Sequence, residues 1–221
     1  MEISVSESKY SLKRKNFSIN NLKLFESYQL VENETRINKF RQLFKNRRSY
    51  RGDLLSINKE TWMEILEDLR NDSNIHPVPS CGNFNFIKVI VIDEKEDIVL
   101  FDLNKGFSTF DNDAANLLRR IQNKNLSRSD IRGKGGTYYI FLLNMEIVKL
   151  KYGTMADALS FVTLGCYIQT ILLNLSIKSI YNCIHFGMLE SFSISVEDGT
   201  YESVCMIRMG EKDDKNKFIN W

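Results

Sequence analysis

The residues best suited to bind an anion lie together at positions 47–51. Arg47, Arg48, Ser49 and Arg51 supply guanidinium groups and a hydroxyl within five positions, with Tyr50 between them. An arginine can hold a phosphate through two parallel hydrogen bonds, so the motif predicts a phosphate site. A solvated basic loop between two helices is the structural alternative.

A second motif, PSCGN at 79–83, combines a turn with polar groups. Gly82 permits close approach of the backbone to a ligand, and Ser80 and Asn83 offer hydrogen bonds to a planar polar molecule. An ordinary turn also explains the motif, because glycine and asparagine are frequent in turns.

Two further motifs lie before and within a long apolar segment at 155–177. Lys151 and Tyr152 stand side by side before it, and such a pair could supply a base or an acid. Gly165 and Gln169 lie one turn apart inside the segment, where a buried amide needs a partner from a ligand or a facing subunit. The alternatives are a surface lysine and plain helix packing.

Composition excludes several classes of protein. The chain has 221 residues, of which 43% are hydrophobic and 26% charged, which is typical of a globular protein and unlike a disordered or collagen-like chain. Its net charge of +2 does not indicate a dedicated nucleic-acid binder. Residues 1–51 nevertheless hold 12 Lys and Arg against 5 Asp and Glu, so this end either meets a partner or forms a solvated arm.

Cysteine and histidine are too few and too scattered for a metal site or a hydrolase triad. No CxxC pair occurs, so we expect no structural zinc and reduced cysteines. The N-terminal MEISVSESKY has no apolar signal core, and we therefore expect a cytoplasmic protein. From the near-neutral charge and the soluble character of most of the chain, we expect neither nucleic acid nor a membrane as a partner. The four cysteines are Cys81, Cys166, Cys183 and Cys205, and the two histidines are His76 and His185.

The hydrophobic period changes after the two prolines, Pro77 and Pro79. Before them, apolar residues recur at helical spacing over 22–44, and a helix capped by Asn58 is expected to bury Trp62 and its apolar neighbours. After them we expect a hairpin of strands 86–92 and 98–103, a helix at 111–124, a buried strand at 137–148, the long helix at 155–177, and strands at 191–196 and 203–209.

This order of elements predicts an α+β fold with a mostly antiparallel sheet flanked by helices. The segment 155–177 has nearly membrane-spanning length, but Asp157 and Asn174 interrupt it. We therefore expect a core helix, or one buried between two subunits.

The order of the motifs resembles that of the flavin-dependent nitroreductase superfamily. RRSYR near residue 50, PSCGN before a hairpin, KYG at 151–153 and a long helix with Gly165 and Gln169 follow one another as in that family. Within it the chain is most similar to the SagB-type, McbC-like azoline dehydrogenases. The long helix departs from the family pattern, since GCYIQT stands where GHxxQN is usual, and IHFG at 184–187 replaces the following glycine-rich turn.

The resemblance implies FMN bound at the interface of an intertwined homodimer. By position, the phosphate and ribityl chain would meet the basic motif, the PSCG turn would approach the flavin ring, and Gln169 would lie on the helix that packs against the partner. Lys151 and Tyr152 match the pair that assists proton abstraction in azoline dehydrogenases. The cofactor-binding residues so implied are Arg47, Arg48, Ser49, Arg51, Pro79, Ser80, Cys81, Gly82 and Gln169.

The implied activity is oxidation of a thiazoline or oxazoline in a ribosomally made peptide, beside a cyclodehydratase. An NAD(P)H-driven nitroreductase or ene-type reductase, and a flavin-free scaffold protein of a modification complex, are the alternatives. The expected organisation is a basic arm at 1–22, the FMN-binding domain at 23–210 and a tail at 211–221. A lone His185 between apolar neighbours is expected to be structural.

Overall fold

The structure is a computed structural model, and it describes residues 38, 41, 49–70, 78, 80, 85–93, 98–126, 133–186 and 191–213. The chain divides into two compact units, 1–42 and 43–221, and the fold given below is that of the second. The predicted basic arm, the predicted tail from residue 214 on, and the helical pattern at 22–44 apart from Asn38 and Arg41 lie outside the described residues. The first two residues of the predicted tail, 211 and 212, belong to the last strand of the sheet. The predicted domain boundaries therefore stay predictions.

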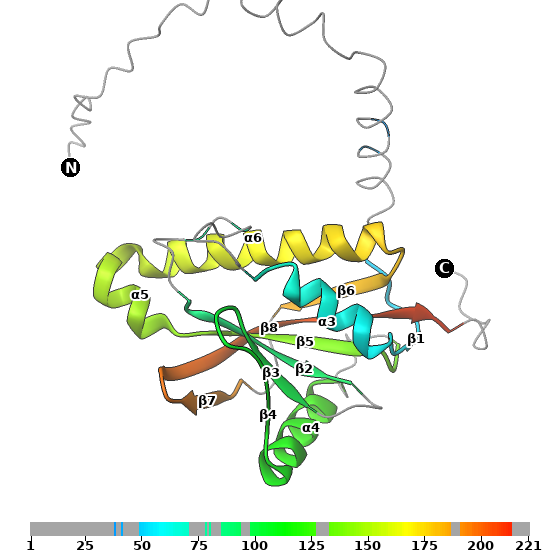
Figure 1. Ribbon diagram of the computed structural model, residues 1–221, viewed down its shortest axis with the longest axis horizontal. Helices are drawn as coiled ribbons and strands as arrows, with labels where there is room; N and C mark the ends of the chain where they lie inside the picture. The colour runs from blue at the N-terminus through cyan, green and yellow to red at the C-terminus, as the bar shows by residue number, and fades with distance from the viewer. Residues whose placement is uncertain are drawn as a thin grey trace, which may run out of the picture. The chain divides into compact units, whose positions relative to one another are not determined.

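A curled antiparallel sheet forms the centre of this unit (Figure 1). Its continuous order is β1-β8-β5-β2-β3-β4, and β6 and β7 also pair with β8. Every ladder between these strands is antiparallel. The strands are β1 Leu54–Leu55, β2 Ile87–Ile92, β3 Val99–Asp102, β4 Gly106–Thr109, β5 Thr137–Leu143, β6 Tyr181–Phe186, β7 Ser193–Val196 and β8 Gly199–Lys212. The predicted α+β architecture is confirmed.

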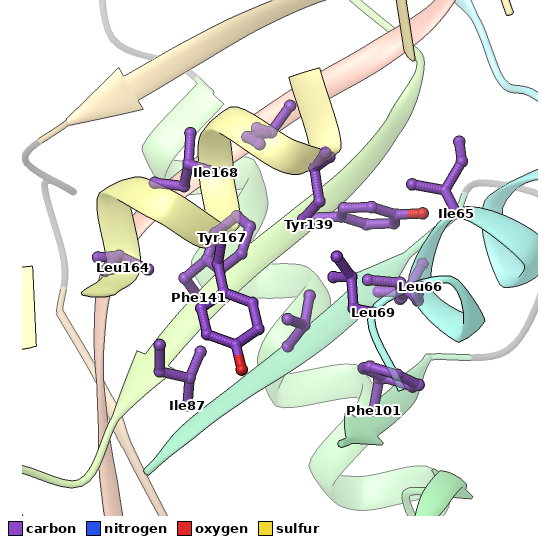
Figure 2. Close-up of a cluster of buried hydrophobic side chains, with 14 of the residues drawn as sticks. Ile65, Leu66, Leu69, Ile87, Phe101, Tyr139, Phe141, Leu164, Tyr167 and Ile168 are labelled. Atoms are coloured by element: carbon purple, nitrogen blue, oxygen red, sulfur yellow. The ribbon is translucent and has the colours of Figure 1, made fainter. Parts of the chain in front are cut away.

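Helices cover both faces of the sheet, and each face has its own apolar core. On one face α3 (Lys59–Glu67) and α6 (Ala156–Ile177) pack on β2 and β5, and Figure 2 shows Tyr167 of α6 beside Phe141 of β5 in this cluster. On the other face α4 (Asn112–Leu126) and β7 enclose a smaller cluster. Fully buried strands of the kind seen in β2 and β5 follow from a sheet that is covered on both sides.

Local signals in the sequence explain why these elements start where they do. The Asn58 side chain accepts a hydrogen bond from the amide of Thr61 at 2.8 Å and begins α3, as predicted. Strands β2 and β3 pair as the predicted hairpin. Asp111 likewise accepts from the amide of Ala114 at the start of α4. Leu118 of this helix is buried, whereas Leu117 is 55% exposed.

The predicted strand at 137–148 is wrong in its second half. Strand β5 ends at Leu143, and α5 (Met145–Tyr152) follows directly. The Asn144 side chain accepts from the amides of Glu146 and Ile147 at 3.1 and 3.3 Å, which caps the new helix. Because apolar residues continue across this cap, the hydrophobic pattern hides the change of element.

A second correction concerns residues 184–186, which were expected in a turn. They are the second half of β6, which pairs with β8 from Tyr181↔Gly210 to Phe186↔Cys205. Strands β1 and β4 are also additions to the prediction; both are short and carry little alternation of polar and apolar residues. Their pairing with β8 and β3, rather than a sequence pattern, determines their position.

The helical stretch Met145–Ile177 is long and apolar enough to cross a membrane by length and composition alone. A core helix of a water-soluble protein passes the same test. One face of α6 is buried against the sheet, including Leu164, Ile168 and Ile171 at 0–5% exposure. This packing agrees with the predicted role as a core helix.

Candidate functional site

The part of the basic motif that the structure describes is fixed to the edge of the sheet. Ser49 forms a parallel bridge with Asn182 of β6, and the amide of Tyr50 donates to the carbonyl of Asn182 at 2.8 Å. The Tyr50 ring lies 4.9 Å from that of Tyr181. The side chains of Ser49 and Arg51 are both exposed. Their donors are therefore held on a fixed backbone and accessible to an anion; Arg47 and Arg48 lie outside the described residues.

The predicted Lys-Tyr pair forms the last turn of α5 rather than a loop. Lys151 is exposed, and its Nζ lies 5.5 Å from the centre of the Tyr152 ring. Tyr152 is half-buried and packs against the main apolar core. Gly153 ends the helix with φ +53, a conformation that other residues rarely adopt. The pair therefore combines an exposed amine with a ring anchored in the core.

These two groups lie at opposite ends of the long helix. Residues 151–152 end α5, and the 3-10 turn η2 (Gly153–Met155) joins them to α6. Tyr50 packs on β6, which begins just after α6 ends (Figure 1). A helix of 22 residues is about 33 Å long. One copy of the chain therefore cannot bring Arg51 and Lys151 to the same small molecule.

The outer face of α6 is apolar and uncovered in the part of the chain that the structure describes. Phe161 and Val162 are 56% and 66% exposed, and Ile177 is 62% exposed. Near the middle of this face, no atom of the described residues lies within 4 Å of the position that a Cβ of Gly165 would occupy. Gln169, predicted as a buried amide, is exposed on the same helix. An exposed apolar strip along a 22-residue helix indicates an interaction surface.

The other predicted ligand-binding motif lies mostly outside the described residues. Of PSCGN only Ser80 is described, and it is half-buried. Pro79, Cys81 and Gly82 carry no structural statement. His185 lies within β6 opposite Met206 of β8 and is half-buried, in agreement with its expected structural position.

No family model and no curated protein sequence matches the chain. Among solved structures, a protein of Ralstonia eutropha JMP134 classed with the nitroreductases matches with a TM-score of 0.60 and 14% identity, over 78% of this chain and 82% of its own. A nitroreductase family protein of Clostridium novyi NT matches with a TM-score of 0.51 and 12% identity, over 81% and 88%. The present chain has the nitroreductase fold.

A chain of the Escherichia coli microcin synthetase complex McbBCD, solved with truncated pro-MccB17 bound, matches the same fold. Its TM-score is 0.56 at 16% identity, over 75% of this chain and 67% of its own. The resemblance predicted from the motifs is thus confirmed for the nitroreductase fold, with an McbC-like structure among the matches. At these identities the comparison concerns the fold alone.

The described part of the basic motif has the groups of an anion-binding site. Ser49 and Arg51 present a hydroxyl and a guanidinium from a backbone that β6 holds in place. Such donors are those that a phosphate requires. Within the described residues no group of His, Cys, Asp and Glu could hold a metal ion.

A buried charge network that the sequence did not predict joins residues of the strands β2, β3 and β8. Lys88 of β2, with its side chain 3% exposed, contacts the carboxylate of Asp102 on β3 and that of Asp198 at 2.9 Å. Its Nζ lies 4.6 Å from the centre of the Tyr201 ring, and the Tyr201 hydroxyl donates to Asp198 at 2.9 Å. Lys88 is the polar residue in an otherwise apolar strand, IKVIVI, and this is the signal that could have revealed the network.

The network makes stability depend on acid pH. Burial acts to raise the pKa of Asp102, but hydrogen bonds from Lys88 and from the amides of Lys105 and Asn104 outweigh it, so the pKa is lowered. A carboxylate with a lowered pKa in the folded state adds stability above its unfolded pKa of about 3.9, and this is lost as pH falls further.

We therefore expect the urea midpoint of the native protein to fall steeply below about pH 4. The variant Asp102→Asn should start from a lower midpoint at pH 7 and lose less of it on acidification. Urea unfolding followed by circular dichroism between pH 3 and 7 tests this expectation. Equal pH slopes in the two proteins would contradict it.

Proposed function

We propose that the chain is an FMN-dependent dehydrogenase that oxidises azolines to azoles in a ribosomally made peptide, and that it works as a homodimer. The observation that supports this proposal is that Ser49 and Arg51 lie near one end of α6 and Lys151 near the other. If two copies of α6 pair antiparallel through their apolar outer faces, the Ser49–Arg51 end of one copy meets the partner's Lys151. The separation seen in one chain is then what a shared site requires.

Each group has a chemical task in this proposal. Ser49 and Arg51, with Arg47 and Arg48 beside them, bind the phosphate and ribityl chain. Pro79, Ser80, Cys81 and Gly82 approach the flavin ring, and Gln169 lies at the subunit contact. Bound oxidised FMN would accept a hydride from the azoline carbon, and molecular oxygen would reoxidise it.

The protein's own share of the reaction is orientation and proton transfer. An azoline becomes an azole by losing one hydride and one proton, so a base must take the proton. Lys151 is exposed, and the Tyr152 ring beside it is anchored in the core, so the position of the pair is defined. A positioned base of this kind accelerates proton removal by about 10²–10⁴-fold.

The peptide substrate and a cyclodehydratase partner belong to the same proposal. The fold of this chain is shared with a chain of a microcin synthetase complex that was solved with a peptide bound. This likeness supports a role beside the enzyme that forms the azoline. A cytoplasmic location would suit such a peptide-modifying complex.

The absorbance spectrum of the purified protein from 300 to 550 nm is the first test. A flavin spectrum that releases FMN on denaturation supports the cofactor, and conversion of an azoline peptide to an azole without nicotinamide supports the dehydrogenase. Rapid bleaching by NADPH followed by reduction of nitroaromatics would favour the reductase instead. A protein that stays colourless after incubation with FMN would overturn both activities and favour a scaffold.

The variant Lys151→Ala should retain FMN and the dimer but lose azole formation by a factor of about 10² or more, because the proton acceptor is gone. The measurement is the single-turnover rate of flavin reduction by an azoline peptide. Lys149→Ala is the matched control, since this lysine is exposed in the same last turn of α5. Normal turnover by Lys151→Ala would show that another group takes the proton.

A further inference from the structure

The segment that carries Ser49 and Arg51 crosses the central strand of the sheet. Strands β5 and β6 pair with the same residues of β8, 205–209, so they lie along its opposite edges. Ser49 is bridged to β6, whereas the amide of Leu54 donates to the carbonyl of Lys134, just before β5, at 2.9 Å. Residues 50–53 therefore pass over β8.

A fully buried arginine lies under this crossing. Arg208 of β8 has 0% exposure, and its Nη2 donates to the carbonyl of Gly52 at 2.8 Å. Side chains alternate along a strand, so Arg208 points to the same face as Met206, which belongs to the core on the α4 side of the sheet. Burying an arginine side chain costs free energy unless its guanidinium group is hydrogen-bonded or paired with a carboxylate. The presence of Arg208 in this strand therefore requires an explanation beyond packing.

Three further contacts hold the same segment at its two ends. The amide of Tyr50 is bonded to Asn182, and the carboxylate of Asp53 accepts from the amide of Lys134 at 2.7 Å. The carbonyl of Asp53 accepts from the amide of Asp213. Between these two ends, Arg208 binds the carbonyl of Gly52, the residue directly after Arg51. This hydrogen bond therefore helps to determine the path of the backbone that carries the Arg51 side chain.

We propose that Arg208 is a positioning residue for the flavin phosphate: it fixes the backbone of residues 49–53 and thereby directs Ser49 and Arg51 at the anion. This inference rests on the proposed FMN function. Arg208 is buried and acts through Gly52, so it needs no contact with the cofactor. Its loss should affect ligands that carry the phosphate and spare those that lack it.

The test combines hydrogen exchange with flavin titrations on the full-length protein. In flavin-free Arg208→Lys, exchange of a peptide covering 49–55 should accelerate about tenfold, because the lysine Nζ lies one bond nearer the backbone than the arginine Nη2 and does not reproduce the hydrogen bond to the Gly52 carbonyl. The affinity for FMN should fall about tenfold, and the affinity for riboflavin, which lacks the phosphate, should stay within about twofold. Asp53→Ala should act in the same direction from the other end of the segment, where Asp53 is half-buried, and it keeps the test available if Arg208 variants fold poorly.

Met206→Ala is the matched control, because it removes a buried side chain from the same face of β8 two residues away. It should lower global stability without changing the ratio of FMN to riboflavin affinity. Unchanged exchange at 49–55 and an unchanged ratio in both Arg208→Lys and Asp53→Ala would overturn the inference, and so would an equal loss of both flavins. Wild-type protein that binds no flavin would instead overturn the proposed function, while the exchange data alone would still decide whether Arg208 holds the segment.

Discussion

Gly165→Leu should leave the fold of one chain intact and abolish the dimer, and flavin binding with it. Among the described residues, no atom lies within 4 Å of the place that a Cβ would take at this position, so a leucine has room beside them. Replacing a mid-helix glycine by a good helix former should stabilise the monomer by about 1 kcal/mol. A leucine between two closely packed helices would instead separate them, and we expect the dimer dissociation constant to rise by about 100-fold or more, as overpacking of a tight contact implies.

Sedimentation velocity and FMN titration measure the two effects, and urea unfolding measures the stability of the monomer. Gly165→Ala is the matched control, since one methyl group brings most of the helix preference and little volume. If Gly165→Leu remained a dimer with full FMN affinity, the outer face of α6 would not be the contact between subunits.

Lys88→Met should destabilise the protein by about 3–5 kcal/mol, since removing one partner leaves buried charge uncompensated. The two carboxylates affected are those of Asp102, whose side chain is 6% exposed, and Asp198, which is 36% exposed. Most small domains unfold with about 5–15 kcal/mol, so a loss of this size would bring the chain close to unfolding at 37 °C.

Urea unfolding at pH 7 provides the measurement, and the double variant Lys88→Met/Asp102→Asn should recover part of the loss. Lys105→Met is the surface control: its ion pair with Glu197 is solvent-exposed, and such pairs contribute little that can be measured. A midpoint for Lys88→Met equal to that of the wild type would show that water already compensates the two carboxylates.

The sequence was sufficient to predict an element where the residues that bound it and the spacing of its apolar residues indicate the same helix or strand. Asn58 begins α3 as expected, and the β2–β3 hairpin follows from two apolar runs separated by charged residues. The spacing of apolar residues did not reveal the end of β5 at Asn144, because apolar residues continue from β5 into α5 on both sides of this capping residue. It also failed for β6, whose pairing with β8 depends on residues about 20 or more positions away.

The candidate site was predictable only in its residue types. The motifs that hold Ser49, Arg51 and Lys151 were recognised from their order, and the fold they implied is confirmed. Their separation along α6 could not be predicted, because it depends on where each loop joins the sheet. Arg208 was also missed, since an arginine within a strand gives no sign in the sequence of the backbone that crosses it.

The length of β8 has a consequence for how the chain acquires its structure. Strands β1, β5, β6 and β7 all pair with β8, and the pairing of β1 joins residues 54–55 to 211–212. None of these ladders can form until residues 199–212 have left the ribosome. Folding governed by such distant contacts is slow, so the early strands must persist with open edges while synthesis continues. Chaperones that shield exposed strand edges should therefore bind this chain mainly before β8 emerges.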